Sequence, residues 1–261
     1  MKCGSRFSPL LSAVAFVGCI SVFWAAYASS LPLMGIAGWA VHRLGAELSA
    51  AAQSGVFDNL VNRSNPQGKT EINITYPSLG RADIDAGIRR WVTAIADAFE
   101  ENLAGDDDAT DEDVPKYELQ GSYVVTRPSA TAISFTFELW TYTGGAHGNL
   151  DIITLNYSLL TGQRLDLVDL FEDPDAALKL MSDWSARELL RRFAGTQMKQ
   201  MILAGAAPEA ENFANLTLTP EGVTIQFQPY QVAPWAAGAQ QVEMPFEKLL
   251  KARPLAVVWG R

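Results

Sequence analysis

Cysteine is almost absent from this chain of 261 residues, which contains only Cys3 and Cys19. Both lie within residues 1–28, a segment with the features of an export signal. If cleavage follows Ala28, the mature chain has no cysteine at all. This excludes a disulfide framework, cysteine ligation of zinc and a thiol nucleophile from the folded region.

Histidine is equally scarce: the chain has only His42 and His147, and only His147 lies in the region expected to fold. A lone histidine without cysteine is a poor zinc site, and the nucleophile-elbow motif G-x-S-x-G is missing. We therefore predict no metal, no cofactor and no catalytic residue. One alternative stays open, in which His147 and nearby carboxylates such as Asp151 form the acid–base pair of an enzyme.

Positive charge is also in short supply, because 20 Lys and Arg residues face 29 Asp and Glu residues, for a net charge of −9. Loss of Lys2 and Arg6 with a cleaved signal would take this to −11. Such a chain is unsuited to nucleic acid and to anionic membrane surfaces, and it favours basic partners. The acidic run at 104–116 lacks the glycine and glutamate spacing of an EF-hand, so we predict a solvated loop there.

The N-terminal segment predicts export to the periplasm or cell envelope. Lys2 and Arg6 precede the uncharged run "PLLSAVAFVGCISVFWAA", and "AYA" ending at Ala28 has the small residues of a cleavage site. Two alternatives remain. The apolar character continues through "LPLMGIAGWAV", which would suit an uncleaved membrane anchor, and Cys19 could be a lipidated cysteine in a poor lipobox.

Composition divides the remaining chain into a spacer at 29–67 and a folded domain at 68–261, with halves at about 68–167 and 168–261. The folded region is predicted to begin near Thr70, because Ile72, Ile74 and Tyr76 alternate as in a strand. Hydrophobic residues at helical spacing predict a helix over 82–103.

Strand patterns dominate the rest of the domain. In the run 131–142, apolar residues alternate with polar ones, which predicts a strand with one buried face. A second helix is predicted after Asp173, which caps it, and a hairpin surrounds "TPEG". Mostly sequential strands with a few helices predict an α+β fold with antiparallel sheets and packed helices.

Two unusual loops supply the candidate binding residues. The first, "TYTGGAHGN", lies between two predicted strands, and the second is "PYQVAPWAAG" at 229–238. Loops on a rigid sheet often carry function, and aromatic side chains make good anchors, so we predict binding here. The alternatives are a structural glycine turn and a loop pinned into the core by Trp235. The candidate binding residues are Tyr142, Gly144, Gly145, His147, Asn149, Tyr230 and Trp235.

Four segments, in order, resemble a known family: "ITYPSLG", "YTGGAHGN", "NYSLLTGQRLDLVDLF" and "FQPYQVAPWAAGAQQVEMPFEKL". They are similar to the extracytoplasmic domain of RsiV-like anti-sigma factors and to the accessory domain of PdaC-like peptidoglycan deacetylases. The resemblance covers about residues 70–255. It implies an α+β fold in two intertwined halves, a cell-envelope location and, in the anti-sigma branch, lysozyme binding.

Two departures from these relatives shape the functional expectation. The start of the chain is too short for a sigma-binding region, and no deacetylase domain follows the matched segments. We therefore predict a non-enzymatic envelope module that binds a lysozyme-like protein or peptidoglycan. The alternative is an envelope glycan hydrolase or deacetylase that uses His147 with nearby carboxylates. A contact with the membrane is expected only through an N-terminal anchor.

Overall fold

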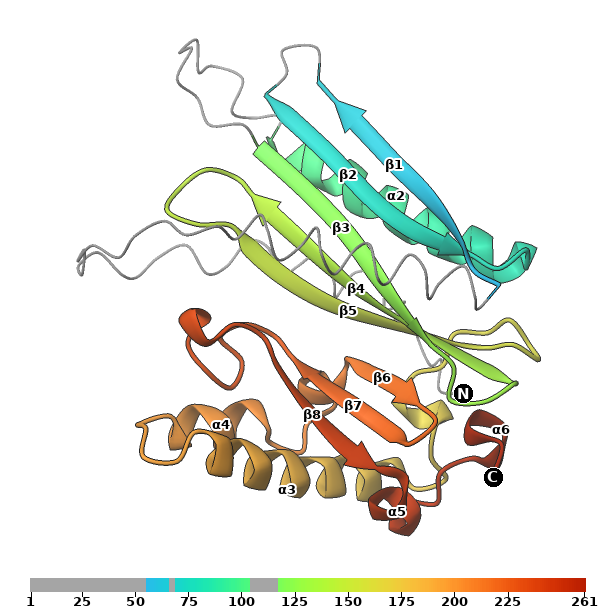
Figure 1. Cartoon of the computed structure of the whole chain (residues 1–261), viewed down its shortest axis with the longest axis vertical. Helices are drawn as coiled ribbons and strands as arrows, with labels where there is room; N and C mark the ends of the chain where they lie inside the picture. The colour runs from blue at the N-terminus through green and yellow to red at the C-terminus, as the bar shows by residue number, and fades with distance from the viewer. Residues whose placement is uncertain (1–54, 66–68, 104–116) are drawn as a thin grey trace, which may run out of the picture. The chain divides into compact units, whose positions relative to one another are not determined.

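The computed structural model describes residues 55–65, 69–103 and 117–261. It contains two β-sheets with helices packed against them, which confirms the predicted α+β class (Figure 1). The strand order is β1-β2-β3-β4-β5 in the first sheet and β6-β7-β8 in the second. The strands are β1 (Phe57–Ser64), β2 (Thr70–Ser78), β3 (Tyr117–Thr126), β4 (Ala132–Tyr142), β5 (Asn149–Ser158), β6 (Leu216–Thr219), β7 (Gly222–Phe227) and β8 (Gln240–Pro245).

Helices flank both sheets. The α-helices are α2 (Ala82–Leu103), α3 (Pro174–Arg192), α4 (Lys199–Gly205), α5 (Phe246–Leu249) and α6 (Ala256–Trp259). The 3-10 helices are η2 (Leu167–Asp169), η3 (Ala210–Phe213), η4 (Trp235–Ala237) and η5 (Leu250–Ala252). No helix in the described ranges is both long and apolar enough to span a membrane. The predicted export signal, His42 and the acidic run 104–116 fall outside the described residues.

The folded region begins earlier than predicted. β1 lies inside the range assigned to the spacer, yet it pairs antiparallel with β2 from Phe57↔Ser78 to Ser64↔Glu71. As an edge strand it has no fully buried residue, so its sequence shows no clear apolar alternation. It is held to α2 by Arg63, whose guanidinium pairs with Asp97 at 2.7 Å.

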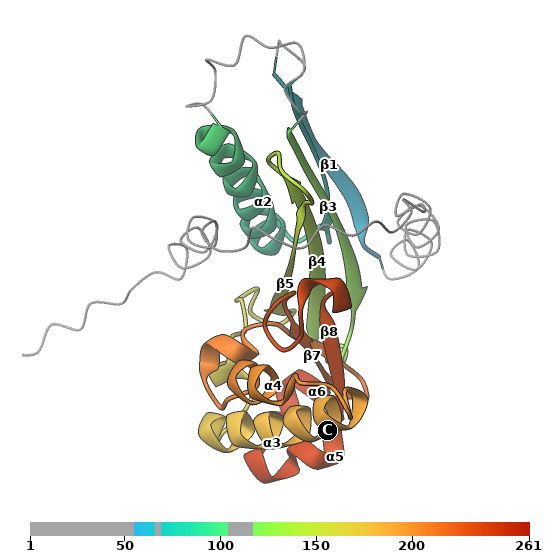
Figure 2. The same ribbon diagram turned by 90° about the vertical axis from the view of Figure 1, so that its left-hand side faces the viewer.

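The first core lies between α2 and one face of the first sheet (Figure 2). Ile72 and Ile74 of β2 are fully buried there, as their alternation predicts. The helical spacing of 82–103 is confirmed too, since Ile84 and Ile88 are buried on the inner face of α2. β2 and β3 are parallel, with α2 in the connection between them, whereas the other strand neighbours in both sheets are antiparallel.

The second core fills the space among the second sheet, α3, α4 and α5. Asp173 caps α3 as predicted, because its carboxylate accepts a hydrogen bond from the Ala176 amide at 3.0 Å. The two halves share contacts but exchange no strand, since each sheet is built from consecutive strands. The intertwining implied by the resemblance is therefore absent from the topology of the described sheets.

β4 differs from its prediction, because both of its faces are buried from Ala132 to Phe137. Phe135 and Phe137 face the α2 side, while the alternate residues face the second sheet. There β6 stands with its edge against β4 and β5. We call the buried polar side chains at this contact the polar seam: Ser134, Thr136, Thr154, Asn156 and Thr217.

The polar seam satisfies the backbone of β6, which an apolar surface could not do. The Leu218 amide donates to Ser134 Oγ at 3.2 Å, and the Ser134 hydroxyl donates to Asn156 Oδ1 at 2.6 Å. Asn156 Nδ2 then donates to the Leu216 carbonyl at 3.0 Å. These buried polar residues mimic the polar face of a half-exposed strand in the sequence, which explains the incorrect prediction for β4.

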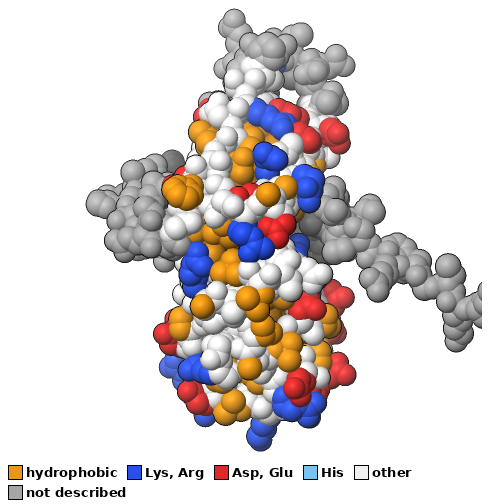
Figure 3. Space-filling view, turned by 90° about the vertical axis from the view of Figure 1, so that its right-hand side faces the viewer, with side chains coloured by type: hydrophobic (Ala, Val, Ile, Leu, Met, Phe, Trp, Pro, Cys, Tyr) orange, Lys and Arg blue, Asp and Glu red, His pale blue; other side chains and the backbone are white. Residues whose placement is uncertain are grey.

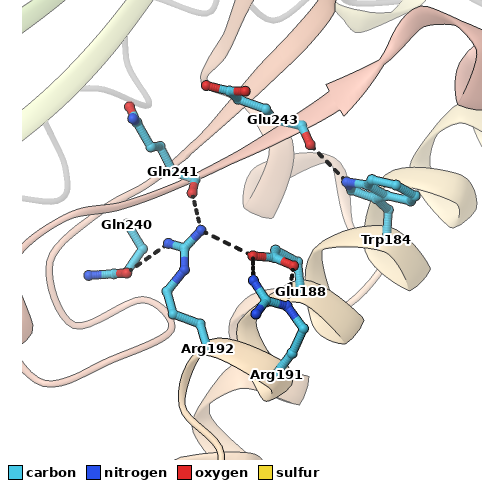
Figure 4. Close-up of polar contacts among 7 residues, drawn as sticks. All are labelled: Trp184, Glu188, Arg191, Arg192, Gln240, Gln241 and Glu243. Carbon is cyan, nitrogen blue, oxygen red and sulfur yellow. Dashed lines mark hydrogen bonds and ion pairs between the residues drawn. The ribbon is translucent and has the colours of Figure 1, made fainter.

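The outer edge of β8 is covered by side chains of α3 (Figure 4). Trp184 Nε1 donates to the Glu243 carbonyl at 2.8 Å, and Arg192 donates to the Gln241 carbonyl at 3.1 Å. Glu188 lies 3.7 Å from Arg192 and so helps to hold its guanidinium at the strand. Outward-pointing strand carbonyls are thus satisfied, which protects the edge from pairing with another strand.

Trp184→Phe removes one of these donors while keeping an aromatic ring on α3. We expect the free energy of unfolding to fall by about 1 kcal/mol, the usual net value of one hydrogen bond. Urea denaturation measures it. Arg191→Ala is the control, because its side chain is 73% exposed and such surface changes stay within about 0.5 kcal/mol. Equal effects of the two substitutions would contradict the role of Trp184.

Candidate functional site

The turn between β4 and β5 depends on its three glycines. Gly144 and Gly145 have positive φ angles of 85° and 97°, which side chains rarely adopt. Gly148 serves a different purpose, since a Cβ there would lie 2.4 Å from Cζ2 of Trp140. The Tyr142 hydroxyl donates to the Gly145 carbonyl at 3.1 Å and closes the turn. The glycines are therefore explained by backbone geometry and by close approach to a ring.

His147 lies exposed on this turn. Its Nδ1 is 2.9 Å from the Gly148 carbonyl, and a carbonyl oxygen only accepts, so Nδ1 carries a proton. Its ring stacks on Trp235, with centroids 4.3 Å apart and planes at 23°. Nε2 makes no hydrogen bond with the described part of the chain. The stack joins the two loops that the sequence singled out.

Trp235 does not pin its loop into the core, contrary to one of the sequence alternatives. It is half-buried at the start of η4 and lies against His147. The residues of this loop that enter the core are Val232 and Ala233, at 0% and 1% exposure. We call residues 142–149 together with residues 229–238 the two-loop surface.

Two glutamines fix the second loop to the scaffold. The amide of Gln228 bonds both backbone groups of Ile152 on the β5 edge, accepting from its N–H at 2.8 Å and donating to its C=O at 2.5 Å. Gln231 Nε2 donates to the Gly205 carbonyl at 2.9 Å and to the Asn212 carbonyl at 3.1 Å. Neither role could be predicted from the sequence, because each depends on partners that are distant along the chain.

Between these glutamines the backbone makes a tight turn. The Gln231 amide donates to the Gln228 carbonyl at 3.0 Å, with Pro229 and Tyr230 in the central positions. Tyr230 has a φ of 68°. Positive φ at the third position of a turn normally calls for glycine or asparagine, and a bulky residue there costs about 1–2 kcal/mol.

The remaining candidates are separate from the stack. Asn149 begins β5, pairs with Thr141 in register and is exposed. Tyr230 is exposed and has no ring contact with a described residue. The structure therefore brings His147 and Trp235 into contact, keeps Tyr142, Gly144 and Gly145 within the supporting turn, and leaves the other two at its margins.

No carboxylate among the described residues is hydrogen-bonded or ion-paired to His147. Asp151 lies on β5 opposite Leu139, whose side chain belongs to the α2-side core. The residue is exposed overall, although desolvation raises the pKa of its carboxyl. No group of three metal-ligating side chains occurs in the described ranges. The geometry thus offers His147 an aromatic partner in place of an acid.

The two-loop surface carries no carboxylate and no Lys or Arg side chain. Residues 139–150 and 222–242 contain none of these four residue types, although the chain has 49 of them (20 basic and 29 acidic). His147 is the only titratable side chain in these stretches apart from tyrosines. The lack of charged residues in these two stretches is visible in the sequence. That the two stretches form one uncharged surface follows only from the contact between the two loops.

Two family models match successive parts of the chain. "Deacetylase PdaC" matches residues 64–150 and "Protein of unknown function (DUF3298)" matches residues 168–247. The first segment contains His147 and the second contains Trp235, so the stack joins the two.

A curated relative is the peptidoglycan-N-acetylmuramic acid deacetylase PdaC of Bacillus subtilis (strain 168), 24% identical over 185 residues. The match covers 70% of this chain and 39% of the relative, so the chain spans about two fifths of that protein. Two solved structures share the fold. The DUF3298 family protein of Pseudomonas aeruginosa PAO1 has a TM-score of 0.56 at 17% identity, with 78% of this chain and 95% of that one covered. The Bacteroides fragilis member has a TM-score of 0.51 at 16% identity, covering 77% and 93%.

Proposed function

This chain carries a PdaC-like/DUF3298 family domain, and from that premise we propose that it is a non-enzymatic binding module of the cell envelope. Its ligand is peptidoglycan, and the two-loop surface is the binding site. The observation that carries the proposal is the His147–Trp235 stack, which places an exposed imidazole on a half-buried indole where two anchored loops meet.

The stack suits sugar recognition. Aromatic rings offer a large, rigid contact area, so little conformational entropy is lost when a ligand binds. The face of an aromatic ring is electron-rich and attracts the C–H groups on the apolar face of a sugar. Nε2 of His147 has no partner among the described residues, so it can form a hydrogen bond with a hydroxyl or acetamido group of the ligand.

Charge supports a glycan over a basic protein as the ligand. The net charge of −9 would suit a lysozyme-like partner, but the two-loop surface has no carboxylate to pair with it. Acidic and basic side chains are also interspersed on the face drawn in Figure 3. The neutral polar surface matches the hydroxyl and acetamido groups of a glycan strand. The relative named above acts on peptidoglycan N-acetylmuramic acid, which supports the same ligand class.

The proposal places the domain outside the cytoplasm, where peptidoglycan lies. The basic start and apolar run of residues 1–28 support export, with cleavage after Ala28 as the favoured route. Mass spectrometry of the protein recovered from an envelope fraction distinguishes a mature N-terminus at Ser29 from a retained anchor or a lipidated Cys19.

Trp235→Ala is expected to weaken binding to purified peptidoglycan roughly tenfold or more, because removal of an aromatic anchor typically costs this much. His147→Ala should weaken binding as well, since it removes the partner that holds the indole in place. Co-sedimentation with insoluble peptidoglycan gives both affinities.

Trp184→Phe is the matched control, since it changes a tryptophan on α3 outside the two-loop surface. It should leave the affinity for peptidoglycan unchanged.

Calorimetry with lysozyme at low salt tests a protein ligand in parallel. Failure of the wild-type chain to sediment with peptidoglycan would refute the proposal, and tight lysozyme binding lost in Trp235→Ala would assign the surface to a protein ligand instead.

A further inference from the structure

Tyr230 occupies a backbone conformation that its residue type disfavours. Only Tyr230 and Arg253 among the described non-glycine residues have positive φ, and glycine holds the other such positions. The turn from Gln228 to Gln231 would accept glycine at 230 without strain. A bulky residue retained in such a conformation needs a compensating benefit.

The fold gives Tyr230 no such benefit. Its side chain is 50% exposed. Its hydroxyl makes no hydrogen bond within the described ranges, and its ring stacks on no described aromatic residue. The neighbouring residues, in contrast, are committed to the scaffold: Gln228 and Gln231 by hydrogen bonds and Val232 by burial.

Arg253 is the other described non-glycine residue with positive φ, and its conformation has a structural reason. It ends η5, and a left-handed residue commonly ends a helix. Its guanidinium pairs with Glu172 at 2.8 Å, and its carbonyl accepts from the Glu172 amide at 3.0 Å. Arg253 thus links η5 to the segment before α3, whereas the Tyr230 side chain makes no such link within the described ranges.

We propose that Tyr230 is a ligand-contact residue whose ring stacks on a sugar ring of the glycan strand. This deepens the proposed function and rests on it. The anchored glutamines hold the Tyr230 backbone in place before the ligand arrives, so binding loses little entropy. The same loop carries Trp235, so one glycan strand would meet two aromatic contacts on a surface without formal charge.

Tyr230→Gly separates this role from a structural one. Relief of the strained conformation should raise the melting temperature of the full-length chain by about 2–4 °C. Affinity for insoluble peptidoglycan should fall roughly tenfold in co-sedimentation. A substitution that stabilises the fold and weakens binding is expected only if the ring is present for the ligand. Tyr230→Phe keeps the ring and should bind within about twofold of wild type.

Arg253→Gly is the matched control, because it relieves positive φ at a site outside the two-loop surface. It should leave peptidoglycan binding unchanged. Wild-type affinity in Tyr230→Gly, or a lower melting temperature, would overturn the contact role while leaving the proposed function intact. If the wild-type chain fails to bind peptidoglycan, the proposed function and the sugar contact fall together. Loss of lysozyme binding alone in Tyr230→Gly would overturn the sugar contact in favour of a protein contact.

Discussion

Asn156→Leu is expected to lower the free energy of unfolding by about 3–5 kcal/mol, although leucine has the same number of side-chain heavy atoms as asparagine and branches at the same carbon. The substitution leaves the Leu216 carbonyl without its donor and the hydrogen of the Ser134 hydroxyl without its acceptor. Both groups are buried, and each unsatisfied buried group costs about 1–3 kcal/mol. Equilibrium urea denaturation measures the loss of stability. An unchanged slope of the unfolding free energy against urea concentration shows that the folded state stays compact.

Asn62→Leu is the matched control, because it makes the same exchange at an exposed position of β1. Its effect should stay within about 0.5 kcal/mol. Ser134→Ala supplies the test of mechanism. In the Asn156→Leu background the serine hydroxyl has already lost its acceptor, so its removal should cost less than it does in the wild-type chain. Strict additivity of the two substitutions would show that they do not act through one hydrogen-bonded network.

Gly205→Ala is expected to destabilise the chain by about 3 kcal/mol, the upper end for overpacking of a close contact. A Cβ at this position would lie 1.9 Å from the carbonyl oxygen of Gln231. Because that oxygen belongs to the backbone, no side-chain rotation relieves the contact. The loop must move away from α4, and it carries Tyr230 and Trp235 with it. Thermal unfolding measures the stability, and peptidoglycan co-sedimentation should show weaker binding under conditions where the variant is folded.

Gly87→Ala is the control for Gly205→Ala, since both glycines lie in helices. The nearest atom to a Cβ at Gly87 is the Tyr157 hydroxyl oxygen at 3.7 Å, an ordinary contact. Alanine inside a helix is favoured over glycine, so this variant should gain about 0.5–1 kcal/mol. If Gly205→Ala were equally stabilising, the close approach of α4 to the second loop would be disproved.

The two variants test the scaffold behind the proposed site. The polar seam fixes the second sheet against the first, and Gly205 fixes the loop that leaves the second sheet. The His147–Trp235 stack spans these parts of the fold. The proposed binding is therefore expected to depend on residues that do not touch the ligand.

The sequence alone determined the elements whose patterns are strong and local. The spacing of Ile84 and Ile88 defined α2, and Asp173 with Pro174 marked the start of α3, because each signal lies within one or two helical turns. The hairpin around Pro220 and the overall α+β class followed in the same way.

Tertiary structure decided what depends on distant partners. β1 was missed because an edge strand buries little, and β4 was assigned one exposed face because its buried serine and threonine read as solvent-facing residues. Their burial is tolerated only because β6, some 80 residues further along the chain, supplies hydrogen-bond partners. In the same way the sequence selected His147 and Trp235 separately, and only the packing of one loop on the other placed their rings in contact.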